Sequence, residues 1–463
     1  MARNKRTRAT LPSSGAPDGR PAGRPAVVAR DTAAPLASVR AATSSRGWGA
    51  SLLDRSTWIV ALTTVLLVPL IVTASTYNSY RLPKEMFVRG AGIAIAALAL
   101  IRWLLFGWSP RWRPDHKWFF VALVVGWSIV TALTASNRVL ALESIAWIGG
   151  CAILFLALDA GLPGRWWSLI YTVLCAAAFN ALYCMLSVLG WAGERGLYEG
   201  RAHGFLGNPD DQGSYLSFAA VGAVALCLAT PRRRALHMAL AALIVSALFA
   251  TQTIGAVAAF FASMFVLTMI AAGRRAIPVG VILVVVGGLV VVTYQPLQSR
   301  IKRWLVASRS GHIDDILSNR GAGILAGWEM FKEHPVVGVG PANYRYEFYD
   351  YKLRVEEQHR TLMLASTRAG QFGDAHNDHV QTLAQTGLPG YALLIAASII
   401  VAARSFRRGE AGVEGRFARL ASLPLVTAFL VSAMPQFPME LAGPMTALIA
   451  VLVPCVMQHG KTA

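Results

Sequence analysis

The chain has 463 residues, of which 55% are hydrophobic and only 14% carry a charged side chain, and its formal net charge is +19. Soluble globular proteins contain about 25% charged residues. This composition, with a mean hydropathy of +0.49, excludes an ordinary soluble enzyme and predicts a membrane protein. The five cysteines lie inside apolar segments, which argues against a disulfide framework or a paired-cysteine metal site. We therefore expect no cofactor.

Residues 1–56 precede the first long apolar segment and are rich in Ala, Pro, Ser and Arg, with ten basic and three acidic residues. A segment without a periodic apolar face is typical of a disordered tail. It is too long and polar for the n-region of a cleaved signal peptide, so we expect the first apolar segment to be retained. A nucleic-acid-binding arm is an alternative reading, but we expect no nucleic acid partner, because the remaining basic residues are spread over loops.

Segments of roughly 17 to 25 apolar residues cross a bilayer, and we identify twelve segments near this length. They are 57–76, 86–106, 118–135, 141–160, 167–191, 213–230, 237–252, 254–272, 277–294, 389–404, 420–436 and 441–457. The least secure division is at Gln252–Thr253, where only a polar interruption separates two spans. The sequence thus predicts an all-α polytopic membrane protein of about twelve transmembrane helices.

Lysine and arginine predict the orientation, because cytoplasmic loops carry more of them than loops on the opposite side. Basic clusters occupy alternate loops, at 111–117, 232–234, 274–275 and 404–419. With these loops inside, both termini are cytoplasmic. The predicted organisation is a disordered cytoplasmic tail (1–56), transmembrane helices one to nine (57–294), a partly helical outside loop (295–388), and helices ten to twelve with a short cytoplasmic tail (389–463).

The loop 295–388 is nearly neutral and holds five of the nine histidines. We therefore expect it to form a subdomain that carries functional side chains. Ile324, Leu325, Trp328 and Phe331 recur at helical spacing and predict an amphipathic helix over 318–333 against the membrane surface or the bundle. A turn at 338–341 precedes five aromatic residues between 344 and 351. Aromatic faces suit sugar rings, although packing against the bundle is the more common role of each tyrosine.

Near the end of this loop, His376 and His379 lie three residues apart in a predicted short helix, 376–385, and would share one face of it. We expect a left-handed glycine at Gly387 to close this helix before span ten. Asp374 and the two histidines have the ligand types of a metal site. No HExxH or paired-cysteine motif supports one, so we expect no bound metal.

A shorter outside loop, 192–212, is the only other one with a comparable density of polar residues. Its glycines and Asn208-Pro209 turn bring the backbone close to another group, and Asp210 or Asp211 is a candidate cap for span six. Arg201 fits ligand binding as well as an interaction with lipid headgroups. We expect the functional site where the two outside loops meet.

Several strings in these loops resemble the O-antigen ligase and O-antigen polymerase superfamily. They are Asn319-Arg320, Trp328, Glu333 to Tyr344 and Ala375 to Gly390, together with the upstream segment Arg201 to Gln212. The motifs cover about a third of the chain, and the twelve-span topology with its long outside loop covers nearly all of it. The chain departs from the family at Gln385, where members often have glutamate.

The resemblance implies a glycosyltransferase of the bacterial inner membrane with its site facing the periplasm. The implied donor is an undecaprenyl-pyrophosphate-linked glycan, and the implied acceptor is a hydroxyl of lipid A core or of another lipid-linked glycan. Carried over by motif, His376 is the catalytic residue, and Arg201 and Arg320 bind the pyrophosphate, with Arg300 and Arg303 as rivals to Arg320. The candidate supporting residues are Asn377, His379, Asn208 and Arg303.

These residue types suit that chemistry. Arginine presents a fixed fork of donors and stays charged, so two arginines can replace a magnesium clamp on pyrophosphate. Histidine titrates near neutrality and can accept the hydroxyl proton. A single displacement would invert the anomeric centre, so we expect a metal-independent inverting glycosyltransferase.

Other classes remain open alternatives. A lipid-linked oligosaccharide flippase or another polytopic transporter would place charged residues within its spans near the midplane, whereas the spans predicted here carry few such residues. A non-catalytic assembly protein is a further alternative. Within the superfamily, protein O-oligosaccharyltransferase is the alternative activity.

Overall fold

The structure is a computed structural model of the chain. It describes residues 33–456 except 77, 110, 113–114, 193–195, 274–275, 294, 311–319, 359–372 and 408–411. The chain divides into two units, Met1–Gly49 and Ala50–Ala463. Of the first unit, the structure describes only the beginning of helix α1 (Ala33–Leu67). The sections below concern the second unit.

Residues 33–56, which we predicted as part of a disordered tail, are helical in the structure. The segment is rich in alanine, the residue with the highest helix propensity. No proline interrupts it between Pro35 and Pro69. The first 32 residues of the predicted tail lie outside the described residues.

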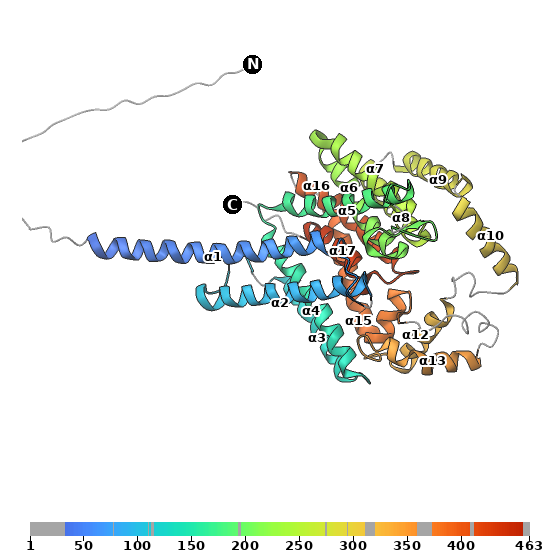
Figure 1. Cartoon of the computed structure of the whole chain (residues 1–463), viewed down its shortest axis with the longest axis horizontal. Helices are drawn as coiled ribbons and strands as arrows, with labels where there is room; N and C mark the ends of the chain where they lie inside the picture. Colours follow the sequence, from blue (N-terminus) through green and yellow to red (C-terminus); the bar gives the residue numbers. More distant parts are fainter. Residues whose placement is uncertain are drawn as a thin grey trace, which may run out of the picture. The chain divides into compact units, whose positions relative to one another are not determined.

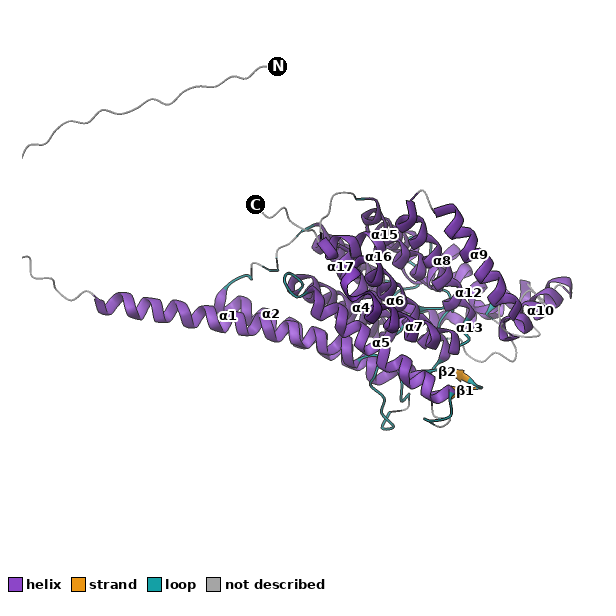
Figure 2. Ribbon diagram, turned by 90° about the horizontal axis from the view of Figure 1, so that it is seen from above, coloured by secondary structure: helices purple, strands orange, loops and turns teal. Residues whose placement is uncertain are grey.

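Helices make up nearly all of the described second unit (Figures 1 and 2). After α1 they are α2 (Arg81–Phe106), α3 (His116–Leu133), α4 (Arg138–Gly161), α5 (Trp166–Val188), α6 (Pro209–Ala229), α7 (Arg234–Ala250), α8 (Ile254–Ala272), α9 (Ala276–Thr293), α10 (Gln295–Ser310), α12 (Gly321–Glu333), α13 (Tyr344–Gln358), α15 (Asp378–Ala402), α16 (Gly412–Ser432) and α17 (Ala442–Val456). Short 3₁₀ turns are η2 (Gly204–Leu206), η3 (Pro231–Arg233), η6 (Ala403–Phe406) and η7 (Pro438–Glu440). The described strands, β1 (Leu197–Tyr198) and β2 (Arg201–Ala202), form one antiparallel pair.

Among the described residues, nine helices are long and apolar enough to cross a membrane, namely α1 to α8 and α15. Helices α9, α16 and the shorter α17 lie on the three remaining predicted spans. The prediction of an all-α polytopic membrane protein is therefore confirmed. The first span lies earlier than predicted, because α1 ends at Leu67, just before Pro69, whose ring cannot continue a helix. The turn predicted at Gln252–Thr253 is present between α7 and α8.

Helix α6 forms the centre of the bundle. Of the residues in the most apolar 18-residue stretch of α6, 89% are buried, whereas the corresponding share in the other candidate spans lies between 17% and 50%. It packs against α5, α7, α8, α16 and α17. Small residues permit this close approach: a Cβ atom added at Gly213 would come within 3.0 Å of the Ala256 side chain. Packing on all sides therefore fixes the position of the first turn of α6.

The long loop 295–388 contributes α10, α12 and α13. Helix α12 ends at Glu333, as predicted, and begins at Gly321, while Ser318 and Asn319 lie outside the described residues. Its buried face consists of small residues and Met330 rather than the predicted large apolar residues. Gly327 explains the difference, because a Cβ there would come within 2.7 Å of Val380 in α15. Trp328 is 42% exposed.

The aromatic segment of this loop serves mainly packing. Tyr344, Phe348 and Tyr351 of α13 are buried in a small core together with α12. The Tyr344 hydroxyl donates to the Gly323 carbonyl at 2.7 Å. Tyr346 and Tyr349 remain about half exposed, so only part of the segment is available to a ligand.

Candidate active site

The polar residues of the two loops 192–212 and 295–388 meet at one end of the bundle. This is the end where α2, α6, α8, α15 and α17 begin and where α7 and α16 end. Five separate stretches of the chain therefore contribute to one region. The residues below come from these helix ends and the loops between them.

A short hairpin positions Arg201. In the β1–β2 pair, Tyr198 lies opposite Arg201. The two residues between them, Glu199 and Gly200, both have positive φ angles of 51° and 76°, as in a type I′ hairpin turn. The tight turn places Arg201 beside the start of α6.

Asp210 joins the two arginines that the family motifs indicated. Its carboxylate accepts a hydrogen bond from Arg201 Nη2 at 2.6 Å and forms an ion pair with Arg320 Nη2 at 3.1 Å. Each guanidinium takes a different carboxylate oxygen. The structure thus brings together residues from the two loops, as the sequence predicted, and both arginines pair with one carboxylate.

The backbone of neighbouring helix ends holds the same two guanidinium groups. Arg201 Nε donates to the Thr251 carbonyl, and its Nη2 donates to the Thr253 hydroxyl oxygen, both at 3.0 Å. Arg320 donates to the Pro435 carbonyl at the end of α16. The turn between α7 and α8 and the segment after α16 therefore fix the distance between the two arginines.

His376 lies just before α15 and not inside it. Its φ angle is 51°, and α15 begins only at Asp378. The imidazole packs edge-to-face on Phe437, with ring centroids 4.8 Å apart. Burial, followed by the nearby positive charge of Arg320, lowers the pKa of His376 to about 4. The negative charges of Asp374 and Asp210 oppose this lowering of the pKa. The protonation of His376 therefore depends on charged residues from both loops.

The prediction that His376 and His379 share a helix face is wrong. Because Asn377 caps the helix, His376 falls outside the first turn, whereas His379 is helical. His379 Nε2 bonds with the Leu430 carbonyl at 3.0 Å, and Nδ1 bonds with the Tyr391 hydroxyl at 3.3 Å. His379 therefore ties α15 to α16 and does not face the arginines.

The two candidate asparagines are helix caps. The Asn377 side chain accepts from the Val380 N–H at 3.0 Å at the start of α15. The Asn208 side chain accepts from the Asp210 N–H at 2.7 Å at the start of α6. Asn208 thus takes the capping role that we predicted for Asp210 or Asp211, which leaves Asp210 for the arginines.

A second polar group lies beside His376, and of its members the sequence analysis singled out only Asp374. Arg81 donates to Glu85 at 2.7 Å and pairs with Asp374 at 3.2 Å. Gln381 Nε2 donates to both Asp374 and Glu440, each at 3.2 Å. Burial and then the charge of Asp374 raise the pKa of Glu440. The available sequence signal was a carboxylate in the short polar break between the last two spans.

The N-terminus of α15 is also tied to this region. Asp378 N–H donates to the Ala433 carbonyl at 2.9 Å, and the Asp378 carboxylate accepts from the Met439 N–H at 2.9 Å. These bonds join α15 to the segment between α16 and α17. The same junction holds His376 and Phe437 in contact with each other.

The structure adds less about the other residues that the sequence analysis named. Arg300 and Arg303 lie in α10, but their side chains are outside the described residues. Within the described part of the chain, no three His, Cys, Asp or Glu residues are grouped as a metal site would need. Gln385 is buried, and its backbone carbonyl accepts a hydrogen bond from the Gly340 N–H at 3.0 Å.

Comparison with known proteins adds one match. Residues 239–395 match a family model described as O-antigen ligase. The matched segment includes Arg320 and His376, whereas Arg201 and Asp210 lie before it. No curated protein matches the chain.

Proposed function

We propose that the chain is a membrane glycosyltransferase acting in cell-surface polysaccharide assembly. The match of residues 239–395 to a family model described as O-antigen ligase supports this proposal. The proposed donor is a glycan on undecaprenyl pyrophosphate. The proposed acceptor is a hydroxyl group of lipid A core or of another lipid-linked glycan. The site would face the periplasm from the inner membrane, with both termini in the cytoplasm.

One observation carries this proposal: Arg201 and Arg320 converge on a single carboxylate next to His376. A carboxylate between two guanidinium groups occupies the kind of position that a phosphate group favours. The Asp210 side chain is 25% exposed, so a ligand can reach this position. In the proposed complex the pyrophosphate shares or replaces Asp210 on the two arginines.

The two arginines would assist departure of the leaving group. As the glycosidic bond breaks, negative charge grows on the pyrophosphate oxygen, and fixed positive charges stabilise that change most effectively. The hydrogen bonds that the two arginines donate to Thr251, Thr253 and Pro435 hold the guanidinium groups before the donor arrives. This arrangement supports a role that magnesium fills in other transferases.

His376 is the proposed general base. Its lowered pKa keeps the imidazole neutral at physiological pH, so it can accept the proton of the attacking hydroxyl. A bound pyrophosphate would offset the positive charge of Arg320 and raise the basicity of His376. Direct attack by the hydroxyl on the anomeric carbon, with the pyrophosphate leaving from the opposite face, would invert the configuration.

The second polar group supports binding of the sugar hydroxyls. Asp374, Gln381 and Glu440 offer several hydrogen-bonding atoms within a small volume beside His376. Sugars are recognised by such sets of polar side chains with an aromatic ring nearby, and Phe437 supplies that ring.

A reconstituted transfer assay tests the assignment. His376→Ala should lower the rate by about 100-fold to 10,000-fold, the usual contribution of a general base. The matched control is His334→Ala, because His334 is an exposed histidine in the same outside loop. Transfer should also persist in EDTA. Near-normal turnover by His376→Ala would end the catalytic assignment.

Deletion of the gene distinguishes the acceptors. If the protein is a ligase, long chains disappear from lipid A core while lipid-linked polymer is still made. If it is a polymerase, single repeat units accumulate instead. Unchanged surface polysaccharide together with loss of glycosylated protein would favour protein O-oligosaccharyltransferase.

A further inference from the structure

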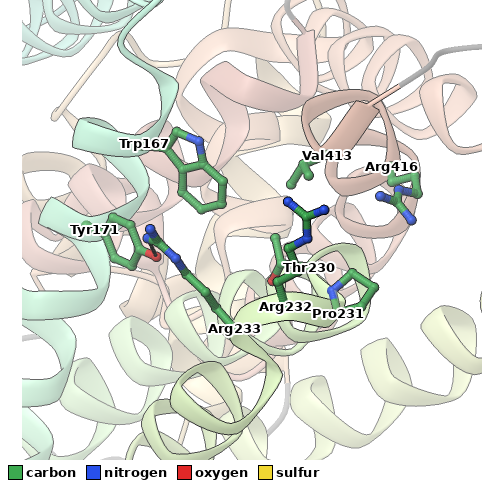
Figure 3. Close-up of a pocket in the computed structure, with 8 residues that line it drawn as sticks. All are labelled: Trp167, Tyr171, Thr230, Pro231, Arg232, Arg233, Val413 and Arg416. Carbon is green, nitrogen blue, oxygen red and sulfur yellow. Dashed lines mark hydrogen bonds between the residues drawn. The ribbon is translucent and has the colours of Figure 1, made fainter.

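A cavity lined by both arginine and apolar side chains lies at the end of the bundle opposite the candidate active site. It has a volume of about 740 Å³, and its lining residues are Trp167, Tyr171, Thr230, Pro231, Arg232, Arg233, Val413 and Arg416 (Figure 3). The walls come from the start of α5, the junction of α6 with α7, and the start of α16. None of these residues takes part in the proposed transfer reaction.

The cavity is far from the arginine pair. Asp210 lies in the first turn of α6, whereas Thr230 follows its last residue. A helix rises 1.5 Å per residue, so the two ends of α6 are roughly 30 Å apart, about the thickness of the hydrocarbon core of a bilayer. The cavity therefore lies at the other membrane interface.

Three arginines give the cavity its charge. Arg232, Arg233 and Arg416 line it, and none of its lining residues is acidic. Within the described part of the chain, none of these three arginines has a carboxylate within 4.0 Å. The positive charge is therefore available to an anionic ligand.

An aromatic wall positions one of these arginines. The rings of Trp167 and Tyr171 stack with centroids 5.5 Å apart. The Arg233 guanidinium lies over the Trp167 ring at 5.8 Å and donates to the Tyr171 hydroxyl at 3.0 Å. Figure 3 shows Trp167, Tyr171 and Arg233 along one side of the cavity and Arg232 on another.

Buried polar groups behind this wall fix the tyrosine. The Tyr171 hydroxyl is 3.2 Å from His237 Nε2, and His237 Nδ1 is 2.7 Å from the Thr230 hydroxyl. His237 itself is fully buried. These hydrogen bonds link Thr230, His237, Tyr171 and Arg233 in series and connect α5, the end of α6 and α7. The position of Arg233 is therefore fixed by packed helices, unlike that of an arginine on a mobile surface.

We infer that this cavity binds the phosphate group of an anionic membrane lipid, such as a phosphatidylglycerol. Arginine binds phosphate through paired donors, and basic pockets between helices at a membrane interface recognise lipid headgroups. Trp167, Pro231 and Val413 add an apolar surface, which suits the glycerol backbone and the first carbons of an acyl chain. Free inorganic phosphate has the same charged group but would leave this surface unused.

Native mass spectrometry of the full chain in detergent tests the inference. Dioleoyl phosphatidylglycerol should bind saturably, and the variant Arg232→Gln/Arg233→Gln should bind it at least tenfold more weakly, because each charge-assisted hydrogen bond contributes about 1.5 to 3 kcal/mol. The matched control is Arg234→Gln, because Arg234 is adjacent and exposed but does not line the cavity. It should bind the lipid as the unmodified chain does.

Two further arms identify the source of the phosphate. Dioleoyl phosphatidylcholine and inorganic phosphate are titrated in parallel, and both should bind at least tenfold more weakly than phosphatidylglycerol. If inorganic phosphate competes equally well, the lipid assignment is overturned. If the double variant and the control lose binding equally, the cavity assignment is overturned. Arg416→Gln, on a different helix, provides an independent variant should the double substitution disturb folding.

Discussion

Asp210 is the residue on which the proposed site depends most directly, because both arginines use its two oxygens. Two guanidinium groups placed this close would repel each other without an anion between them. Asp210 therefore holds the two arginines together in the structure, and the proposed donor pyrophosphate takes over this task during the reaction.

Arg201→Lys tests whether the shape of the guanidinium matters beyond its charge. Arg201 donates to three different groups from Nε and Nη2, and a lysine ammonium on a flexible stem does not reproduce this fork. We expect transfer to fall at least about tenfold, the effect of losing one charged hydrogen bond. The assay compares kcat/KM with that of Arg354→Lys, because Arg354 lies on the outer surface of α13. Full activity in Arg201→Lys would reduce Arg201 to a general anion anchor.

The pH dependence of kcat/KM reports the free enzyme's base. His376 must be neutral to accept a proton, and its pKa is lowered to about 4. Activity should therefore persist as the pH falls through 6.5 and decline only near pH 4 to 5. Arg320→Gln removes a positive charge that lowers this pKa, so its acidic limb should move to higher pH. An acidic limb at pH 6.5 in the unmodified chain, with no shift in Arg320→Gln, would contradict the role of His376.

At the level of secondary structure elements, the break in α15 shapes the site. Gly387 has a φ angle of 65°, and the Leu388 N–H donates to the Pro335 carbonyl at 2.8 Å. The break lets the turn after α12 dock on α15, where Val339 N–H donates to the Ala384 carbonyl at 2.8 Å. Arg320 immediately precedes α12, and His376 lies just before α15. The packing of α12 on α15 therefore places these two residues near each other.

Gly387→Ala should destabilise the chain and reduce transfer. A Cβ at this position would lie 2.1 Å from the Val336 carbonyl oxygen, and a non-glycine residue in such a conformation costs about 1 to 3 kcal/mol before that contact is counted. The midpoint of thermal unfolding in detergent should fall. Gly149→Ala in α4 is the control, because nothing lies within 4 Å of its Cβ position. Equal midpoints for both variants would refute this account of the break.

The sequence predicted helices well where local signals were strong. Apolar length located a helix over every span, and Gly387 was recognised as a break. It failed where tertiary contacts decide: the first turn of α15 begins two residues later than expected because Asn377 caps it. Similarly, Arg81 and Glu440 lie 359 residues apart, and only packing of the bundle brings them together.

For the whole molecule, the separation of the two polar sites leads to a test of orientation. The end carrying Arg201 and His376 should face the periplasm, and the end carrying Arg234 should face the cytoplasm, because basic loops stay inside. Cys175 is the exposed native cysteine, and the other four are buried or little accessible. A Cys175→Ser background therefore permits labelling of introduced cysteines.

In that background, a membrane-impermeant maleimide added to spheroplasts should label Tyr349→Cys and should not label Arg234→Cys. Tyr349 is 50% exposed in α13. Permeabilised cells should show labelling of both variants, which controls for accessibility. The reverse pattern in intact spheroplasts would overturn the orientation and, with it, the periplasmic assignment of the site.

The long sequence separation between partners also has a consequence for how the protein is made. Arg81 enters the membrane with the second helix, yet its bond to the Glu440 carbonyl forms only when η7 follows α16. Phe437, which packs on His376, arrives in the same late segment. A nascent chain that has inserted every earlier helix still lacks these partners, so we expect the proposed activity to begin only after translation has passed η7. Incomplete chains released earlier would occupy the membrane without handling the lipid-linked substrate.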